Sequence, residues 1–353
     1  MDNTPSLSPR IAIIELCAMC SVPMSLKAAL NLNVFDIMAK ASKPMSAQEI
    51  VKEMPQSKSP NYENLSRIMR LLTSYHVFEE HVDQSMENPA KYELTAVGKA
   101  LVRREDGCSL GSLIHLNQDK VLMDAWQFLH EAVTDGDVEP FVKCHGKSPQ
   151  ELALENPGVQ PKIYMESMAA STMLFMEDLL ASSYNGFEGI NVLVDIGGGI
   201  GKALSMIVAK YPSITGINFD LPYVIQHAPS FPGIKHEMGS MFDSIPSGDA
   251  MFLKRVLHNW NDDQCIKILR NCYEKLAKKG KVIVLDCVLP SKTNANADCR
   301  AALELDLHMM ALNAGAKERS LHDFKMIAEA AGFKSVKLVY QLDVLLSVIE
   351  IYN

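Results

Sequence analysis

The chain has 353 residues, of which 48% are hydrophobic and 22% are charged. This length favours two domains over one large domain, and the composition is that of a folded globular protein. The formal net charge of -8 opposes nucleic-acid binding, because neutralising phosphates requires clustered Lys and Arg.

The N-terminal segment from Ile11 to Phe35 is strongly apolar but carries Glu15, Pro23 and Lys27 in its interior. Each of these residues is expensive inside a bilayer, and no basic region with a cleavage pattern precedes the segment. The pattern therefore predicts helices that face protein, and we expect no membrane partner.

The eight cysteines are scattered along the chain rather than gathered into a framework of closely spaced pairs. This usage is typical of a reducing compartment and predicts a cytoplasmic protein. Cys17 and Cys20 form a C-x-x-C, but no second pair completes a zinc set. We interpret both as small apolar residues of a packed helix and expect no metal site.

Residues 1–110 indicate short helices followed by a small hairpin. Ser46 and Glu49 form a capping box, a second helix is expected over 63–75, and strands are expected over 76–82 and 91–95. This order resembles a winged-helix module. The hairpin is acidic, with Glu79 and Glu80, so the pattern favours a dimerisation domain over DNA binding.

The segment from about 111 to 189 is helical in pattern and rich in methionine and aromatic residues, such as Met123, Trp126 and Met176. Most of these side chains are expected in a core. Flexible methionines also suit the wall of a pocket for a flat aromatic ligand, so we interpret this segment as the acceptor side of a domain spanning 111–353.

The remaining sequence alternates apolar strands with helices, which is typical of parallel βαβ units in a doubly wound α/β sheet. Strands are expected over 192–196, 216–220, 251–256 and 282–288, with a helix over 262–276. Two more strands, over 336–341 and 345–352, are joined by too few residues for a crossover helix. The sheet is therefore expected to end in an antiparallel hairpin.

The turn after the first of these strands reads D-x-G-x-G-x-G, with Asp195, Gly197, Gly199 and Gly201. A P-loop is excluded because Ala203 stands where its Ser or Thr should follow the Lys. The third glycine of a dinucleotide turn is also missing, so a nicotinamide cofactor is disfavoured.

A ligand with both an amine and a carboxylate fits this turn better than a phosphate. The helix N-terminus can face the carboxylate, and Asp195 can attract the amine directly or through water. Asp220 ends the next strand, where a carboxylate can accept hydrogen bonds from both hydroxyls of a ribose. S-adenosylmethionine has all of these groups.

Three groups that can move or stabilise a proton follow other strands. His258 comes just after the strand over 251–256, Asp286 falls near the end of the strand over 282–288, and Glu318 lies in a later loop. Because the carboxyl ends of parallel strands meet at one edge, we expect the three side chains to converge on one cleft. Taken alone, a histidine at a helix start can equally be a surface or capping residue.

Five ordered motifs carry a more specific signal: "LVDIGGGIG", "GINFDLPYVI", "LHNWNDDQCIKIL", "VIVLDCVLP" and "GAKERS". Together they resemble the plant caffeic-acid-type small-molecule O-methyltransferases, over nearly the whole chain. The resemblance implies a homodimer, S-adenosylmethionine as cofactor with S-adenosylhomocysteine as product, and His258 as catalytic base beside Asp286 and Glu318. It also implies cofactor contacts by Gly197, Asp220, Ser240, Met241 and Lys254, and acceptor contacts by Asn117, Met309 and Asn313.

The chain departs from the family pattern at three places. Ser240 stands where an Asp is common near the adenine. Arg255 replaces the usual Trp after the Lys, which removes a flat surface and places a cation at the acceptor pocket. Ala314 and Ala316 in "NAGAKER" replace residues of N-P-G-G-K-E-R, which changes the stiffness of the loop that carries Glu318.

These observations predict a Rossmann-like S-adenosylmethionine methyltransferase domain with an N-terminal winged-helix-like dimerisation domain. The expected reaction is O-methylation of an aromatic plant metabolite: a phenylpropanoid, a flavonoid or an alkaloid. The alternatives are N-methylation or a non-methylating reaction in the same pocket, and a catalytically silent subunit of a dimer.

Overall fold

The structure is a computed structural model that describes residues 8–55, 59–83, 89–136, 138–155, 159–313 and 315–353. The chain divides into two compact units. The first comprises Met1–Met123 with Gly158–Ser171, and the second comprises Asp124–Pro157 with Thr172–Asn353. Ala314, one of the departures from the family pattern, lies outside the described residues.

The first unit packs short helices around a small antiparallel sheet of order β1-β3-β2. Its predicted capping box is confirmed, since Ser46 and Glu49 bond reciprocally, and the predicted hairpin is the pair β2 and β3. Phe35, Met69 and Tyr92 are at the centre of its core. The elements are α1 (Pro9–Ala18), α2 (Ser21–Asn31), α3 (Val34–Ala41), β1 (Met45–Ser46), α4 (Ala47–Glu53), α5 (Tyr62–Ser74), β2 (Phe78–His81), β3 (Lys91–Leu94), α6 (Ala96–Ala100) and α7 (Gly111–Asn117).

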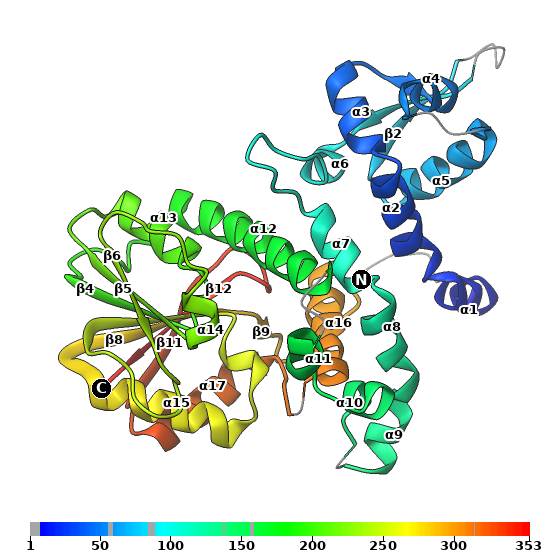
Figure 1. Ribbon diagram of the computed structural model, residues 1–353. Coiled ribbons are helices and arrows are strands. Elements are labelled where there is room, and N and C mark those ends of the chain that lie inside the picture. The colour runs from blue at the N-terminus through cyan, green and yellow to red at the C-terminus, as the bar shows by residue number, and fades with distance from the viewer. Residues whose placement is uncertain (1–7, 56–58, 84–88, 137, 156–158, 314) are drawn as a thin grey trace, which may run out of the picture. The chain divides into compact units, whose positions relative to one another are not determined.

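The second unit is built on a seven-stranded sheet of order β11-β12-β8-β7-β4-β5-β6 (Figure 1). The five strands from β8 to β6 pair in parallel, and β12 joins them antiparallel and forms a hairpin with β11. This confirms the predicted doubly wound sheet and its terminal hairpin. The strands are β4 (Val192–Ile196), β5 (Thr215–Asp220), β6 (Ile234–Met238), β7 (Gly248–Lys254), β8 (Leu276–Asp286), β11 (Ser335–Gln341) and β12 (Ser347–Tyr352).

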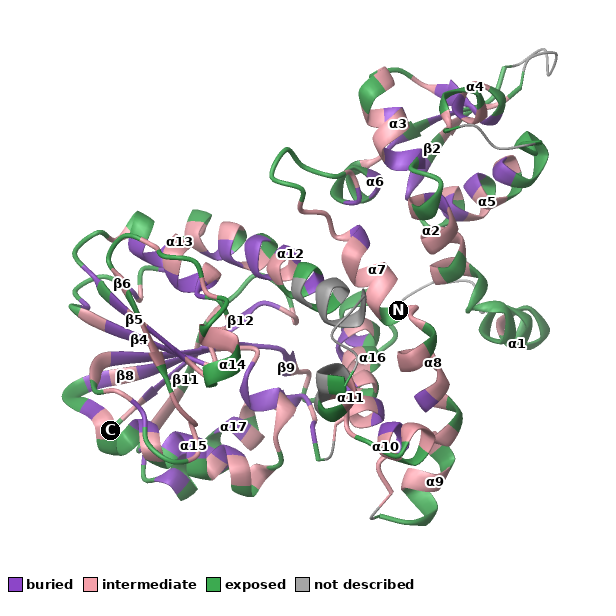
Figure 2. Cartoon of the chain, in the orientation of Figure 1, coloured by how far each residue is buried: buried purple, intermediate pink, exposed green. Residues whose placement is uncertain are grey.

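Helices cover both faces of this sheet because successive strand residues point to opposite sides and both sides are apolar. Val194 and Met251 face α15 (Asp262–Lys275) and α17 (Leu321–Ala331) in one core. Their neighbours Leu193 and Phe252 face α13 (Lys202–Lys210) and the end of α12 (Val159–Ala181) in the other core. Figure 2 shows the central strands buried between these two layers.

The remaining elements of the second unit are short helices and paired segments around the sheet. They are α8 (Lys120–Ala125, which begins in the first unit), η1 (Trp126–Phe128), α9 (Leu129–Thr134), α10 (Pro140–His145), α11 (Pro149–Glu155), α14 (Pro222–Ile225), η2 (Leu257–Asn259), β9 (Val288–Leu289), α16 (Ala297–Leu312) and β10 (Arg319–Ser320).

Two predicted boundaries are corrected. The strand expected to run through Val256 ends at Lys254, because the next residue, Arg255, has a φ of 56° and leaves the extended conformation. The strand expected over 282–288 begins earlier, at Leu276, and ends at Asp286. The helix between them is capped by Asn261, which forms a capping box with Gln264.

Candidate active site

The polar residues predicted for the cofactor and the chemistry meet at the carboxyl edge of the parallel sheet. Asp195 is the last residue but one of β4 and the glycine turn follows that strand, while Asp220 ends β5, Lys254 ends β7 and Asp286 ends β8. Neighbouring pairs in the sheet run in the order β8-β7-β4-β5, so these four strand ends stand side by side. Open α/β sheets bind their ligands at this edge.

The glycine turn after β4 depends on backbone conformations that only glycine adopts readily. Gly197, Gly199 and Gly201 have φ values of 68°, 60° and 85°. Gly201 is the N-cap of α13, and the N–H of Gly199 donates to Asp220 Oδ2 at 2.7 Å. A Cβ on Gly199 would meet nothing within 4 Å, so the turn leaves open space above its backbone for a close ligand.

Gly198, which the sequence motif leaves unspecified, is required for a different reason. A Cβ placed on it would lie 2.2 Å from Asn218 Oδ1 and 2.6 Å from the carboxyl of Asp195. The pattern D-x-G-x-G-x-G treats this position as free. A β-carbon at Gly198 would therefore push apart the two side chains on which the turn rests.

We expect Gly198→Ala to weaken binding of S-adenosylhomocysteine by about tenfold or more, because a shift of the turn by about 1 Å misplaces every contact made through it. Isothermal titration calorimetry measures this affinity. Gly136→Ala is the matched control, since a Cβ there meets nothing within 4 Å. Equal affinity in both variants would contradict this interpretation of the turn.

Asp195 lies beneath the turn rather than on its surface. Its residue is 1% exposed, and its Oδ2 has no hydrogen-bond partner. Burial raises the pKa of Asp195 to about 7, against the charge of Lys254, whose own pKa burial lowers to about 8. Asp195 and Lys254 thus place one carboxyl and one amine at the carboxyl edge of the sheet, and burial disfavours the charged form of each.

The carboxylate of Asp220 holds the glycine turn by a hydrogen bond and can still accept hydrogen bonds from a ligand. Besides the N–H of Gly199, its carboxylate accepts the N–H of Leu221 at 2.7 Å. Each carboxylate oxygen can accept more than one hydrogen bond, so capacity for hydroxyl donors remains. Ser240 and Met241 follow β6 at the same edge, and the carbonyl of Met241 is held by Asn271 Nδ2 at 2.7 Å.

His258 lies in η2, directly after β7, and is almost fully buried. Its Nδ1 is 2.9 Å from Glu318 Oε1, which fixes the ring. When Nδ1–H donates to this carboxylate, Nε2 carries the lone pair that can accept a proton. Asp286 lies beside them: the side-chain nitrogen and oxygen atoms of the three residues fall within 4.8 Å of one another.

The segment that carries Glu318 is fixed to the His258 turn by its own backbone and by Arg319. The N–H of Lys317 donates to the carbonyl of His258 at 3.0 Å. Arg319 is 1% exposed and donates to the carbonyls of Leu257 and Trp260 and to Asp262. These bonds make Arg319 a positioning residue that sequence reasoning missed.

Arg255 lies against both acidic residues of this group. Its Nη1 is 3.6 Å from Asp286 Oδ1, and its Nη2 is 3.6 Å from Glu318 Oε1. The grouping of His258, Asp286 and Glu318 has the atom types of a metal site, but a cation of the chain itself already stands beside both carboxylates.

The electrostatics of this cluster are dominated by burial. Burial, and then the charge of Arg255, lower the pKa of His258 to about 3, although Asp286 acts in the opposite direction. Burial also raises the pKa of Glu318 to about 7. The imidazole is therefore neutral at pH 7.

The predicted acceptor residues divide between the two units. Met309 is buried on α16 and Asn313 ends that helix, both in the second unit, whereas Asn117 ends α7 in the first. One turn of α16 also carries His308, whose ring lies 6.2 Å from that of Trp126. Burial and the charge of Arg255 lower the pKa of His308 to about 4, so this imidazole also is neutral at pH 7.

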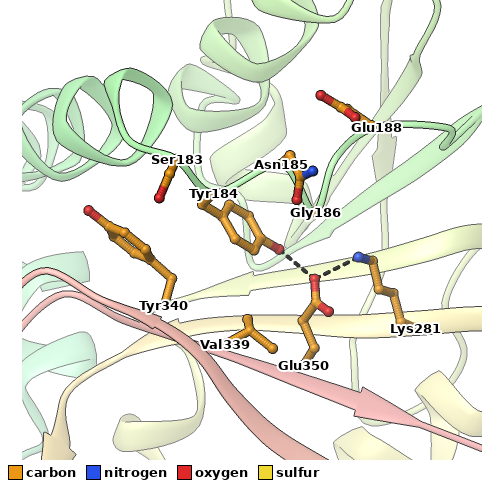
Figure 3. A pocket seen from close by; sticks show the side chains of 9 residues that line it. All are labelled: Ser183, Tyr184, Asn185, Gly186, Glu188, Lys281, Val339, Tyr340 and Glu350. Atoms are coloured by element: carbon orange, nitrogen blue, oxygen red, sulfur yellow. Dashed lines mark hydrogen bonds and ion pairs between the residues drawn. The ribbon is translucent and has the colours of Figure 1, made fainter.

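A separate cavity of about 480 Å³ opens at the other end of the sheet, lined by Tyr184, Lys281 and Glu350 among others (Figure 3). Glu350 Oε1 is 2.8 Å from the hydroxyl of Tyr184 and 2.6 Å from Lys281 Nζ. Lys281 and Glu350, two of the charged residues that line this cavity, are thus paired with each other, and we interpret it as structural.

Residues 126–334 match a family described as an O-methyltransferase domain, and residues 14–104 match an O-methyltransferase dimerisation domain. The chain is 40% identical to caffeic acid 3-O-methyltransferase 1 of Ocimum basilicum, over 94% of both chains. It is 42% identical to catechol O-methyltransferase 1 of Solanum lycopersicum, over 92% of this chain and 90% of that one. Human N-acetylserotonin methyltransferase, solved in complex with S-adenosylmethionine, shares the fold, with a TM-score of 0.80 and 19% identity over 99% of each chain.

Proposed function

Since the chain belongs to the plant caffeic-acid-type family of S-adenosylmethionine-dependent O-methyltransferases, we propose that it methylates a phenolic hydroxyl with His258 as the general base. The observation that carries this proposal is the 2.9 Å contact between His258 Nδ1 and Glu318 at the carboxyl edge of the sheet. The acceptor is an aromatic plant metabolite, of the phenylpropanoid, flavonoid or alkaloid class.

The residues at this edge fit the cofactor. The open backbone at Gly199 admits a close ligand, Asp220 keeps capacity for ribose hydroxyls, and Lys254 and Asp195 offer charges of both signs. Ser240 and Met241 are the further residues that we assign to cofactor binding. When bound, S-adenosylmethionine supplies a methyl group that its sulfonium has already activated.

His258 provides what the acceptor lacks. A phenol has a pKa of about 10, so only about 0.1% is ionised at pH 7, and forming the phenolate costs roughly 4 kcal/mol. Nε2 of His258 can take the proton as the oxygen attacks, a contribution of about 10² to 10⁴ in rate. Glu318 then stabilises the imidazolium through the hydrogen bond at Nδ1.

This arrangement predicts that kcat/KM falls at low pH because Glu318 is protonated, and not because His258 is protonated. Because the pKa of Glu318 is raised to about 7, lowering the pH through 7 protonates it and removes the charge that stabilises the imidazolium. His258, with its lowered pKa, stays neutral over the same range. We expect kcat/KM to fall below about pH 7 in the wild type, and the Glu318→Gln variant to be slower but nearly flat from pH 5 to 8. An inflection that survives in Glu318→Gln would contradict the assignment.

The proposed reaction is tested by incubating the protein with isotopically labelled S-adenosylmethionine and a panel of acceptors that includes caffeic acid, flavonoids and phenolic amines. Mass spectrometry of the products identifies O-methyl and N-methyl compounds. O-methyl products support the proposal, whereas label found only on nitrogen, or on no acceptor, overturns it.

We assign the acceptor pocket to Asn117, Arg255, Met309 and Asn313. Residues 1–110 are proposed as the dimerisation domain and residues 111–353 as the methyltransferase domain, with 111–189 helping to form the acceptor pocket. The proposal includes a cytoplasmic homodimer without a nucleic-acid or membrane partner.

The N-terminal helices supply an apolar surface for the dimer. Pro9–Asn31 is long and apolar enough to cross a membrane by length and composition. Ile14 on α1 is 62% exposed, and Figure 2 shows α1 as an exposed helix. Because this surface belongs to the segment that matches a dimerisation domain, we assign it to contact with a second copy of the chain.

A further inference from the structure

We propose that Arg255 is a second catalytic residue, whose guanidinium holds the reacting oxygen of the acceptor as an oxyanion while His258 takes its proton. This inference rests on the proposed function and deepens it. It assigns to the site a donor for the developing negative charge, in addition to a base.

The exposure of the cluster separates the groups that a ligand can reach from those that it cannot. The side chains of Arg255 and His258 are 19% and 10% exposed, whereas those of Asp286 and Glu318 are 0% exposed. An acceptor that enters the site therefore meets a cation and an imidazole. The two carboxylates lie behind them.

The guanidinium keeps unused donor capacity although it lies among acidic groups. Its distances of 3.6 Å to Asp286 and Glu318 are too long for hydrogen bonds, and Nη1 has no hydrogen-bond partner. Buried polar groups in native structures nearly always have a partner, and an exception calls for an explanation. Nη1 itself is buried beside Asp286, but the side chain as a whole is 19% exposed, so a phenolate oxygen can approach the guanidinium from the open side. Hydrogen bonds between charged groups are the stronger ones.

The backbone of Arg255 supports a functional role. Its φ of 56° is uncommon for a residue with a side chain, and the conformation is held by the bond of its N–H to Leu285 O and of Asn259 Nδ2 to its carbonyl. Backbone strain of this kind gathers at functional sites, where the surrounding structure enforces it. The positive φ of Arg255 ends β7, and the side chain lies beside Asp286 at the end of β8 and beside Glu318.

The balance of charge in the reaction explains why two residues are needed. The O–H bond of the acceptor breaks and its proton goes to Nε2 of His258, while the electron pair of the oxygen forms the new bond to the methyl carbon as the carbon–sulfur bond of the cofactor breaks. Before that bond is complete, a cation and an anion have formed from two neutral groups. Glu318 stabilises the imidazolium, and Arg255 stabilises the oxygen.

The charged and titratable groups around Arg255 come from several elements. Lys254 precedes it at the end of β7 and interacts with the charge of Asp195, His258 follows it in η2, and His308 on α16 is a neutral ring at pH 7. Asp286 ends β8, and Glu318 directly precedes β10. Burial raises the pKa of both carboxyls.

The test measures the ionisation of a bound chromophoric acceptor, 4-nitrocatechol, in the presence of S-adenosylhomocysteine. The absorbance of its phenolate reports the bound ionisation constant without turnover. We expect this constant to be about tenfold or more larger in the wild type than in Arg255→Met, with Arg255→Lys between them. Affinity for S-adenosylhomocysteine serves as the check on folding. Equal constants in the wild type and Arg255→Met overturn the proposal.

Steady-state kinetics with the same variants test the proposal independently. If Arg255 stabilises the oxyanion, Arg255→Met loses about tenfold or more of kcat/KM with caffeic acid and markedly less with the more acidic 4-nitrocatechol. Equal losses with the two acceptors show a structural counter-ion and overturn the proposal. A wild-type protein that methylates no phenol of the acceptor panel contradicts the proposed function itself, whereas wild-type turnover with no effect of Arg255→Met contradicts only the role of Arg255.

Discussion

Replacing His258 with Ala lowers kcat/KM by about 10² to 10⁴ and leaves the affinity for S-adenosylhomocysteine nearly unchanged. The reason is that the imidazole acts on the acceptor proton, a contribution of that size, and bonds within the site to Glu318 rather than to the glycine turn. Steady-state kinetics with the acceptor, together with calorimetric titration of S-adenosylhomocysteine, measure both quantities.

Two further variants make this result specific. His258→Gln keeps a side-chain donor toward Glu318 but offers no basic nitrogen, so it is expected to be as inactive as His258→Ala while folding like the wild type. His322→Ala removes an exposed histidine of α17 and is the matched control with full activity. Undiminished turnover in His258→Ala would show that the base lies elsewhere.

Replacing Arg319 with Met has the largest expected effect on stability. The guanidinium is buried and donates to the carbonyls of Leu257 and Trp260 at 2.8 and 2.7 Å, and its loss leaves both acceptors without these partners. At about 1.5–3 kcal/mol for each hydrogen bond lost from the charged donor, the second unit is destabilised by about 3–6 kcal/mol. Thermal and urea denaturation, followed by circular dichroism, measure this loss.

Activity is expected to fall with stability, because Arg319 ties the Glu318 segment to the turn that carries His258. A displacement of about 1 Å between base and acceptor can cost about 10² in rate. Arg270→Met is the control, since this exposed arginine of α15 makes one bond, to the carbonyl of Ala330. Similar unfolding midpoints for Arg319→Met and Arg270→Met would contradict the role given to Arg319.

The parts of the site that follow parallel strands could be predicted from the sequence. Apolar strand runs identify where each strand ends, and the carboxyl ends of parallel strands must meet at one edge. His258 and Asp286 were placed together on this ground, and the structure brings them within one cluster. Glu318 depended on the resemblance of "GAKERS" to a family motif, because a loop has no periodicity that fixes its position.

Contacts made by side chains across long stretches of sequence could not be predicted. Arg319 bonds to residues 57 to 62 positions earlier, and an arginine in an "ERS" segment carries no signal that it is buried. Gly198 is fixed by Asn218 on the neighbouring strand, a pairing that depends on sheet register. The edge strand β6, from Ile234 to Met238, was missed because its residues are only partly buried and lack an apolar run.

The replacement of the family's Trp by Arg255 predicts a cation near the acceptor, but it does not predict which groups the side chain contacts. The sequence indicates a substitution of Arg for Trp and nothing about exposure or strain. Only the fold shows that the guanidinium of Arg255 lies against two buried carboxylates and that the residue has a φ of 56°. The role of a residue that departs from a family pattern therefore depends on contacts that only the structure gives.

The central claim is that one edge of the sheet holds the cofactor with His258 facing the acceptor oxygen. A crystal structure with S-adenosylhomocysteine and an aromatic acceptor tests it most directly. We expect the cofactor product over Gly199 with its ribose at Asp220, and the acceptor hydroxyl within hydrogen-bond distance of His258 Nε2. A ligand bound elsewhere, or an imidazole turned away from the acceptor, would contradict this claim.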